Sequence, residues 1–286
     1  MNKEVRIVRQ RILPDQGRDR MLRFAVYDKD AVAGQWKKEN VIVLDSIKIN
    51  VFLEGSFSVF SDGKLHQPIY GDLCILSPCK MHYGQIPAPT HLHYYEIDVG
   101  LHAFDAVPDG AQLIARLLET VTPRDAFARP DPQSREHVLT LCREIETSIA
   151  QNERALAYAK VIELLSLFQR LYSTSNLLPG VAFSYHTAKA VQYLEAHYAE
   201  AISVQALAEH ARVSPSYLSR VFKKETGRGL HEYLNQYRIL KAAALLEDHS
   251  VTETAYLCGF SDSSHFISVF RRYMRVTPRA YQKNGS

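Results

Sequence analysis

Short apolar runs separated by turn residues dominate the chain up to about Leu101. The runs cover Val41–Leu44, Ile47–Leu53, Phe57–Phe60 and Leu73–Leu76. Glycine or proline beside a polar residue separates them at Glu54-Gly55, Asp62-Gly63, Gly71-Asp72 and Ser77-Pro78. Many short strands at this spacing predict a small β-barrel or sandwich.

From about Asp109 the apolar residues recur at helical spacing instead. Asp109–Val121 is one predicted helix, and Pro130-Asp131-Pro132 interrupts the chain after it. Asp131 can act as the N-cap of a new helix with Pro132 at its first position. A further helix is predicted from about Leu156 to Tyr172. The polar stretch from Ser173 to Gly180 then indicates a linker.

An all-helical module opens with Tyr185–Tyr198 and contains a displaced copy of itself. Val204–Ala208 resembles Val251–Ala255, Val213-Ser214 matches Phe260-Ser261, and Val221–Lys224 matches Val269–Arg272. The offset is 47 residues early and 48 late, so one residue is inserted in the second copy. Internal similarity of this extent is hard to obtain by chance, and it indicates two copies of one structural unit.

The first copy has the signals of a helix-turn-helix. Ser203 can cap a helix that runs to about Ala211, and a tight turn follows at Arg212-Val213. Ser214 can cap the next helix, with Pro215 at its first position.

The second copy repeats these signals with other residues. Ser250 and Glu253 have the spacing of a capping box. Gly259 supplies the turn, because glycine adopts a positive φ without steric cost. Asp262–Tyr273 is the predicted second helix of this unit. The apolar segment Tyr233–Leu246 is predicted to be the helix that holds the two units together.

The second helix of each unit has an apolar face and a polar face. Leu218, Val221 and Phe222 face inward in the first unit, and Phe266, Val269 and Phe270 in the second. The outward residues are Ser216, Tyr217, Ser219, Arg220, Lys223 and Lys224, then Ser263, Ser264, His265, Ile267, Ser268, Arg271 and Arg272.

These polar faces suit the major groove of DNA, which admits one α-helix. Arg220 can form two hydrogen bonds with a guanine, and Tyr217 can touch a thymine methyl group or a phosphate. Lys223, Lys224 and the Arg271-Arg272 pair lie one turn further on, where backbone phosphates pass. Two rigidly joined units would enter successive grooves about 34 Å apart. The alternative is a plain helical bundle with solvated basic residues. Two tandem units, each ending in a basic pair, favour DNA over that alternative.

The charge distribution agrees with this interpretation. The net charge of the 286-residue chain is +3, and the segment 184–286 holds 13 Lys+Arg against 9 Asp+Glu. No apolar run approaches the roughly 18–20 residues of a membrane helix, and the N-terminus is polar, so we expect a cytoplasmic protein without membrane contact. The cysteines (Cys74, Cys79, Cys142 and Cys258) form no C-x-x-C pair and are interpreted as reduced thiols.

The residues from about Tyr185 to Gln282 resemble the DNA-binding module of the AraC/XylS family. The resemblance is carried by Leu207-Ala208, Ser214–Gly227, Tyr237–Ile239, Ala242 with Leu245-Leu246, Gly259–Phe266, Phe270–Arg272, and Thr277-Pro278 with Tyr281. Three positions depart from the family pattern. Thr254 replaces an aliphatic residue, Arg275 a glycine and Gln282 an arginine.

The resemblance also implies which side chains contact bases. By position these are Ser216, Tyr217, Ser219 and Arg220 in the first unit, and Ser263, Ser264, Ile267 and Ser268 in the second. The second set has no long polar side chain, so we expect weaker sequence readout and more phosphate anchoring there.

The front half resembles the sensor domain of the same family through Gly71–Pro78 and His82, which look like a strand and turn of a cupin barrel. This resemblance implies that a small metabolite, often a sugar, binds inside the barrel. The candidate ligand contacts are His82, Tyr83, His93 and Tyr95, with Trp36 as a candidate cap. The alternative is that they are barrel residues with satisfied hydrogen bonds and that Trp36 belongs to the core.

A metalloenzyme is the competing hypothesis for the front half, because His91-x-His93, His82 and Glu96 are potential metal ligands. The order of these motifs is the reverse of that in metal cupins. Glu96 also has the wrong parity to share a strand face with His93. We therefore expect no enzyme activity, no metal and no cofactor.

The helix after Asp131 carries an apolar stripe of Val138, Leu141, Cys142, Ile145 and Ile149. Such a stripe is either buried in its own domain or, as the resemblance implies, pairs with its copy across a dimer. We favour the dimer.

The sequence thus predicts an α+β protein of two domains. A cupin-like β-barrel over 1–105 and helices over 106–173 form the sensor and its dimerisation element. A linker over 174–183 leads to an all-α DNA-binding domain over 184–286 with two helix-turn-helix motifs. The predicted function is a transcription regulator, expected to be an activator, controlled by a small metabolite such as a sugar. Its predicted partners are double-stranded DNA, the effector, RNA polymerase and a second copy of the chain.

Overall fold

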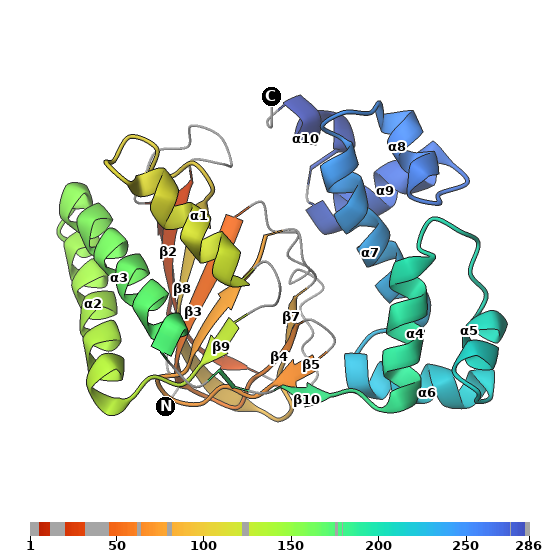
Figure 1. Ribbon diagram of the computed structural model, residues 1–286, viewed down its shortest axis with the longest axis horizontal. Helices are drawn as coiled ribbons and strands as arrows, with labels where there is room; N and C mark the ends of the chain where they lie inside the picture. Colours follow the sequence, from red (N-terminus) through yellow and green to blue (C-terminus); the bar gives the residue numbers. More distant parts are fainter. Residues whose placement is uncertain are drawn as a thin grey trace.

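The computed structural model describes residues 6–11, 21–31, 46–61, 64–78, 82–121, 126–174, 177–178, 180–274 and 276–283 (Figure 1). Several of the residues discussed above are not among them. Trp36, the predicted strand Val41–Leu44, Cys79 and Arg275 lie outside the described residues.

The front of the chain forms two antiparallel sheets. The larger has the order β1-β2-β8-β3-β6-β9 and the smaller the order β10-β5-β4-β7. The strands are β1 (Arg6–Arg11), β2 (Leu22–Ala31), β3 (Ser46–Glu54), β4 (Ser58–Ser61), β5 (Lys64–His66), β6 (Leu73–Leu76), β7 (Tyr83–Gln85), β8 (Thr90–Gly100), β9 (Ala126–Ala128) and β10 (Val181–Ala182). The apolar runs predicted around 47–53, 57–60 and 73–76 are strands β3, β4 and β6.

The two sheets share one apolar cluster. Phe52 of β3, Leu76 of β6 and Phe127 of β9 pack with Val59 of β4, so the sheets meet face to face. The predicted sheet-rich front domain is therefore confirmed. The described strands form two sheets rather than one closed barrel, and the relation to cupins stays a prediction.

Three helices cover the other face of the large sheet: α1 (Gly110–Val121), α2 (Pro132–Ala150) and α3 (Arg154–Thr174) (Figure 1). Asp131 caps α2 as predicted, because its Oδ1 accepts hydrogen bonds from the amides of Gln133 and Ser134 at 3.0 and 3.1 Å. Within the described ranges, no helix combines the length and the apolar character needed to cross a membrane.

The apolar stripe of α2 belongs to the core of its own domain. Val138, Leu141, Cys142 and Ile145 are buried in the same cluster as the strands of the large sheet and the helix α3. The preference for a dimer interface was wrong for these side chains, because a partner cannot reach them. The homodimer itself stays a prediction.

The C-terminal part is all-helical. Its elements are α4 (Tyr185–Ala196), α5 (Val204–His210), α6 (Pro215–Thr226), α7 (Leu230–Leu245), α8 (Val251–Leu257), α9 (Ser263–Met274) and α10 (Pro278–Lys283). Helix α7 serves two separate cores. Tyr233 and Leu234 pack with the first helix-turn-helix unit, whereas Ile239 and Ala242 pack with the second. The predicted joining helix is thus confirmed, and it begins three residues before the predicted start.

Polar contacts reinforce this joint. The guanidinium of Arg238 on α7 donates to the carbonyl oxygens of Tyr198 and Glu200 at 2.7 and 2.8 Å, and it lies 5.5 Å from the ring centroid of Phe260 in the second unit. Gln282, one of the departures from the family pattern, donates from Nε2 to the carbonyl oxygen of Leu246 at 2.9 Å. This side chain therefore satisfies a backbone acceptor at the end of α7.

Part of the predicted linker docks on the small sheet. Val181 and Ala182 form β10, which pairs with β5. The next residue, Phe183, stacks on Phe60 of β4 with ring centroids 5.1 Å apart and planes 8° apart. The start of the helical part is therefore held by direct contacts with the sheets.

Candidate functional site

The two helix-turn-helix units have the same turn. Arg212 and Gly259 occupy matching positions, and both have a positive φ, 56° and 78°. The amide of the following residue closes each turn in the same way. Val213 donates to the carbonyl oxygen of Ala208, and Phe260 to that of Ala255, both at 3.0 Å. The repeat in the sequence is therefore a repeat in backbone geometry, and the turn predicted at Gly259 is confirmed.

The predicted caps are also present, with one difference. Ser203, Ser214 and Ser250 each accept a hydrogen bond at the side-chain oxygen from the amide three residues later, at 3.1–3.3 Å. The cap of α9 is Asp262, which accepts from the amides of Ser264 and His265 at 3.1 and 2.8 Å. The inserted residue of the second copy therefore lies in the turn before Asp262.

The capping box of α8 is only half formed. Ser250 caps the amide of Glu253, but the carboxylate of Glu253 pairs with the ring of His249 at 3.2 Å.

Helices α6 and α9 present the predicted polar faces. Leu218 and Phe222 are buried and Val221 is half-buried, and Phe266, Val269 and Phe270 are buried in the second unit. All the outward residues except the half-buried Ser263 are exposed. These are Ser216, Tyr217, Ser219, Arg220, Lys223 and Lys224 on α6, and Ser264, His265, Ile267, Ser268, Arg271 and Arg272 on α9.

The exposed faces are positively charged. Arg220, Lys223 and Lys224 on α6 and the Arg271-Arg272 pair on α9 form no ion pair within the described part of the chain. Helix α9 contains no acidic residue, and the single acid of α6, Glu225, accepts hydrogen bonds from Ser184. Unpaired cations on two similar faces attract a polyanion.

Two of the predicted effector contacts, His93 and Tyr95, lie on the same face of the large sheet. Tyr95 lies on the helix-covered face, where its hydroxyl is 3.4 Å from Oε2 of Glu146 on α2. His93 is half-buried, with its ring centroid 6.1 Å from that of Tyr95. His82 is buried, whereas the side chain of Tyr83 lies outside the described parts. The ligand role of these residues and of Trp36 stays a prediction.

The opposite side of the large sheet faces the small sheet, and we call it the inner face. Beside the apolar cluster it carries a buried group of charged side chains. Lys48 of β3 lies 3.0 Å from Glu96 Oε2 and 3.2 Å from Asp98 Oδ1, both on β8. Arg23 of β2 donates from Nε to Asp98 at 2.7 Å, and the hydroxyl of Tyr27 donates to Glu96 at 3.2 Å. The side chains of Lys48, Glu96 and Asp98 are 5%, 9% and 2% exposed.

Two opposing effects act on the ionisation of this cluster. Burial disfavours the charged form of Asp98, but Lys48 and Arg23 outweigh it and hold the pKa of Asp98 below its usual value. For Lys48, burial is likewise outweighed by Glu96 and Asp98, so the pKa of this ammonium group is raised. Asp98 and Lys48 are therefore both charged at neutral pH.

Aromatic rings adjoin the charged cluster on the inner face. Tyr27 stacks on Tyr94 with ring centroids 4.6 Å apart and planes 8° apart, and Phe57 lies 6.1 Å from Tyr94. The alternation along β8 predicts that Tyr94, Glu96 and Asp98 share one face while His93 and Tyr95 share the other. Only the packing of the two sheets shows that the first of these faces is the inner one.

Comparisons with known proteins agree with the helical arrangement. A family model described as a helix-turn-helix domain matches residues 207–284. The HTH-type transcriptional activator RhaS of Salmonella heidelberg (strain SL476) is 35% identical over 185 residues, which cover 60% of this chain and 64% of the relative. RhaS of Salmonella schwarzengrund (strain CVM19633) is 42% identical over 123 residues, 41% of this chain and 42% of the relative.

The helix-turn-helix part of the chain, residues 207–284, is of the AraC/XylS type. One solved structure similar to this chain is the DNA-binding domain of AdpA in complex with a target DNA. The match has 34% sequence identity and a TM-score of 0.34, and it covers 35% of this chain and 92% of the AdpA domain. The AraC/XylS-type match at 207–284 lies entirely within the helical part. The chain spans 64% of the length of the first relative and 42% of the second.

Two of the potential metal ligands of the front half, His91 and Glu96, are engaged by other side chains. The ring of His91 lies between Asp28 and Asp30, at 2.7 and 2.9 Å. Glu96 is engaged by Lys48 and Tyr27. No group of three or more His, Cys, Asp or Glu residues suited to a metal ion occurs within the described ranges.

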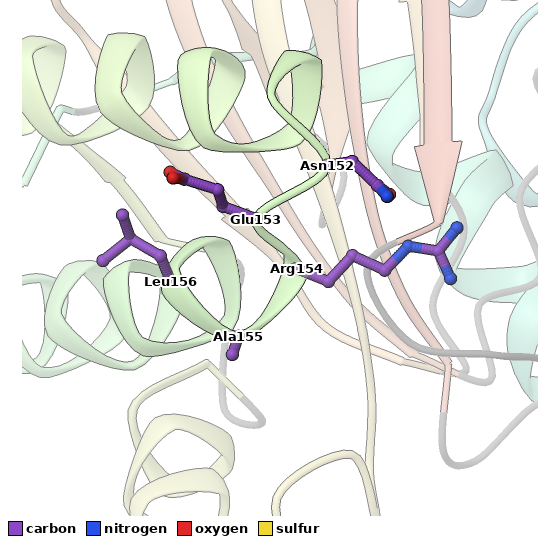
Figure 2. A pocket seen from close by; sticks show the side chains of 5 residues that line it. All are labelled: Asn152, Glu153, Arg154, Ala155 and Leu156. Carbon is purple, nitrogen blue, oxygen red and sulfur yellow. The ribbon is translucent and has the colours of Figure 1, made fainter.

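A hollow of about 790 Å³ lies at the turn between α2 and α3 (Figure 2). The residues that line it follow one another in sequence from Asn152 to Leu156. Their side chains do not converge, because Glu153 and Leu156 point to one side and Asn152 and Arg154 to the other (Figure 2). This hollow therefore lacks the convergent polar groups of a ligand site.

Proposed function

We propose that the chain is a sequence-specific transcription regulator that binds double-stranded DNA through its two helix-turn-helix units. The observation that carries the proposal is the geometric repeat: two units with matching turns, each with an exposed face whose cations are unpaired, joined by α7. The RhaS relatives are named transcriptional activators, which supports activation as the direction of control.

In this proposal the exposed face of α6 reads the base sequence, and the exposed face of α9 mainly binds phosphates. Arg220 contacts a guanine, with Tyr217 and the serines beside it allowing close approach to the base edges. Lys223, Lys224 and the Arg271-Arg272 pair neutralise phosphates. The exposed positions of α9 between Asp262 and Arg271 offer no long polar side chain, so the second unit contributes mainly affinity.

Two substitutions test the division. Arg220→Ala should weaken binding to the preferred duplex by about 1–3 kcal/mol and relax its sequence preference. Lys224→Ala should weaken binding to all duplexes alike and reduce the slope of log K against log salt by about one. Arg116→Ala, at an exposed position of α1, is the control for loss of one charge. Wild-type binding by both test variants in an anisotropy titration would contradict the groove assignment.

The effector belongs to the same proposal. The domain over 1–105 with the helices over 106–173 would bind a small polar metabolite such as a sugar, and the chain would act as a homodimer that contacts RNA polymerase. Stacked rings beside buried polar groups suit a sugar ring and its hydroxyls, and the inner face supplies both. Docking of β10 on β5 gives this part of the chain a direct mechanical connection to the DNA-binding domain over 184–286.

A thermal-shift screen with sugars and related metabolites tests the effector, because a ligand that binds the folded state raises its melting temperature. The shift should be lost in Tyr94→Leu if the inner face binds the ligand, and in His93→Ala if the helix-covered face does. A ligand whose shift survives both substitutions would place the effector elsewhere.

A further inference from the structure

His186, near the start of α4, is half-buried and lies beside α6, the second helix of the first helix-turn-helix unit. Its ring lies against that of Tyr217 on α6, with centroids 5.8 Å apart and planes at 88°. This is the edge-to-face geometry that aromatic pairs prefer. Tyr217 itself is 39% exposed, so His186 supports a ring that faces solvent.

The other edge of the His186 ring is tied to the turn of the unit. Its Nδ1 lies 2.9 Å from the carbonyl oxygen of Ala211, the C-cap residue of α5. A carbonyl oxygen only accepts, so Nδ1 carries the hydrogen and donates it. This bond fixes the orientation of the ring. His186 therefore connects the backbone of the helix-turn-helix turn to the side chain of Tyr217.

Tyr217 in turn contacts the side chain proposed to contact a guanine. The guanidinium carbon of Arg220 lies 5.7 Å from the centroid of the Tyr217 ring, within the range of a cation–π contact. A free arginine on a helix surface samples many rotamers and loses that freedom on binding. A contact that already restricts the guanidinium reduces this loss and favours one orientation over others.

The second unit lacks this arrangement. At the offset of 48 residues, Ser268 matches Arg220 and His265 matches Tyr217. The ring of His265 contacts Phe260 of its own unit instead, at 5.7 Å. Of the two units, the first thus has both an arginine in the first two turns of its outward face, Arg220, and an aromatic ring held beside it, Tyr217.

We propose that His186 is a positioning residue for sequence recognition: it holds Tyr217, and through Tyr217 it orients Arg220 toward one base. The inference rests on the proposed function. Loss of His186 therefore lowers discrimination between duplexes, whereas attraction to phosphates is unaffected because the exposed lysines are untouched.

The experiment uses the full chain and a duplex that the wild type selects from a random pool, with a scrambled duplex of equal length as the non-specific probe. His186→Phe keeps the ring edge, His186→Asn keeps a donor near the position of Nδ1, and His186→Ala removes both. His231→Ala, at an exposed position of α7, is the matched control. Each is made alone and together with Arg220→Ala, and melting temperatures confirm folding.

We expect His186→Ala to lower the ratio of specific to non-specific affinity by roughly two- to tenfold, with non-specific affinity unchanged. His186→Phe should retain more of the ratio than His186→Asn, and none of the three should matter once Arg220 is alanine. An unchanged ratio in His186→Ala, or an equal loss in the Arg220→Ala background, overturns the inference. Failure to select any duplex would instead contradict the proposed function.

Discussion

Replacing Lys48 by methionine should destabilise the front domain strongly, because the change leaves two carboxylates buried without their shared cation. Lys48 lies 3.0 Å from Glu96 and 3.2 Å from Asp98, and none of the three side chains is more than 9% exposed. Breaking a buried ion pair by removing one partner costs about 3–5 kcal/mol. Arg23 still pairs with Asp98 in the variant, so Glu96 should account for most of the loss.

The pH dependence identifies the cause. In the wild type the pKa of Asp98 is lowered, so its contribution to stability is present above the unfolded pKa of about 4 and is lost as pH falls through the folded value. Without Lys48, Asp98 loses one of the two cations that lower its pKa and is easier to protonate. The difference between variant and wild type should therefore shrink as pH falls toward 4.

Urea unfolding followed by the fluorescence of Trp36, the only tryptophan of the chain, measures the difference. The double variant Lys48→Met with Glu96→Gln should recover part of the lost free energy, because a neutral amide replaces the stranded carboxylate. A cost below about 1 kcal/mol at pH 7, or one that does not change with pH, would refute this reasoning.

Three further substitutions have defined outcomes. Gly259→Ala places Cβ 2.5 Å from the carbonyl oxygen of Ala199 at a φ of 78°, so the free energy of unfolding should fall by more than the roughly 1–2 kcal/mol of left-handed strain alone. An unfolding curve like that of the wild type would contradict the turn geometry. Thr254→Val should raise stability by about 1 kcal/mol, because the buried hydroxyl of Thr254 has no hydrogen-bond partner in the described part of the chain; a lower melting temperature would show that the hydroxyl is satisfied. Gly180→Val places Cβ 2.7 Å from the ring of His66, so it should weaken the pairing of β10 with β5 and speed cleavage of the linker in limited proteolysis. An unchanged cleavage rate would mean that the docked strand tolerates the added side chain.

The helical half of the molecule could be predicted from the sequence because its signals are local. Caps at Ser203, Ser214 and Ser250, the turn at Gly259 and the apolar spacing of each helix all act within a few residues. The repeat supplied a second copy of each signal. The exposed and buried faces of α6 and α9 followed directly from these local signals.

The front half could be predicted only in part, because its site depends on long-range register. A shift of one residue exchanges the two faces of a strand, and no local signal shows which face of β8 meets the helices. The sequence therefore does not show whether His93 and Tyr95, the predicted ligand contacts, or Tyr94 and Glu96 on the opposite face of β8 point toward the small sheet. The contact between His186 and Tyr217 likewise could not be predicted from the sequence, because it depends on how α4 packs on α6.

Hydroxyl-radical footprinting of the full chain on a duplex it selects from a random pool tests the central claim most directly. Two rigidly joined units predict two protected stretches on one face of the duplex, one helical turn apart, with Arg271→Ala weakening only one of them. Protection confined to a single turn, or no protection at concentrations that saturate the selected duplex, would contradict the account.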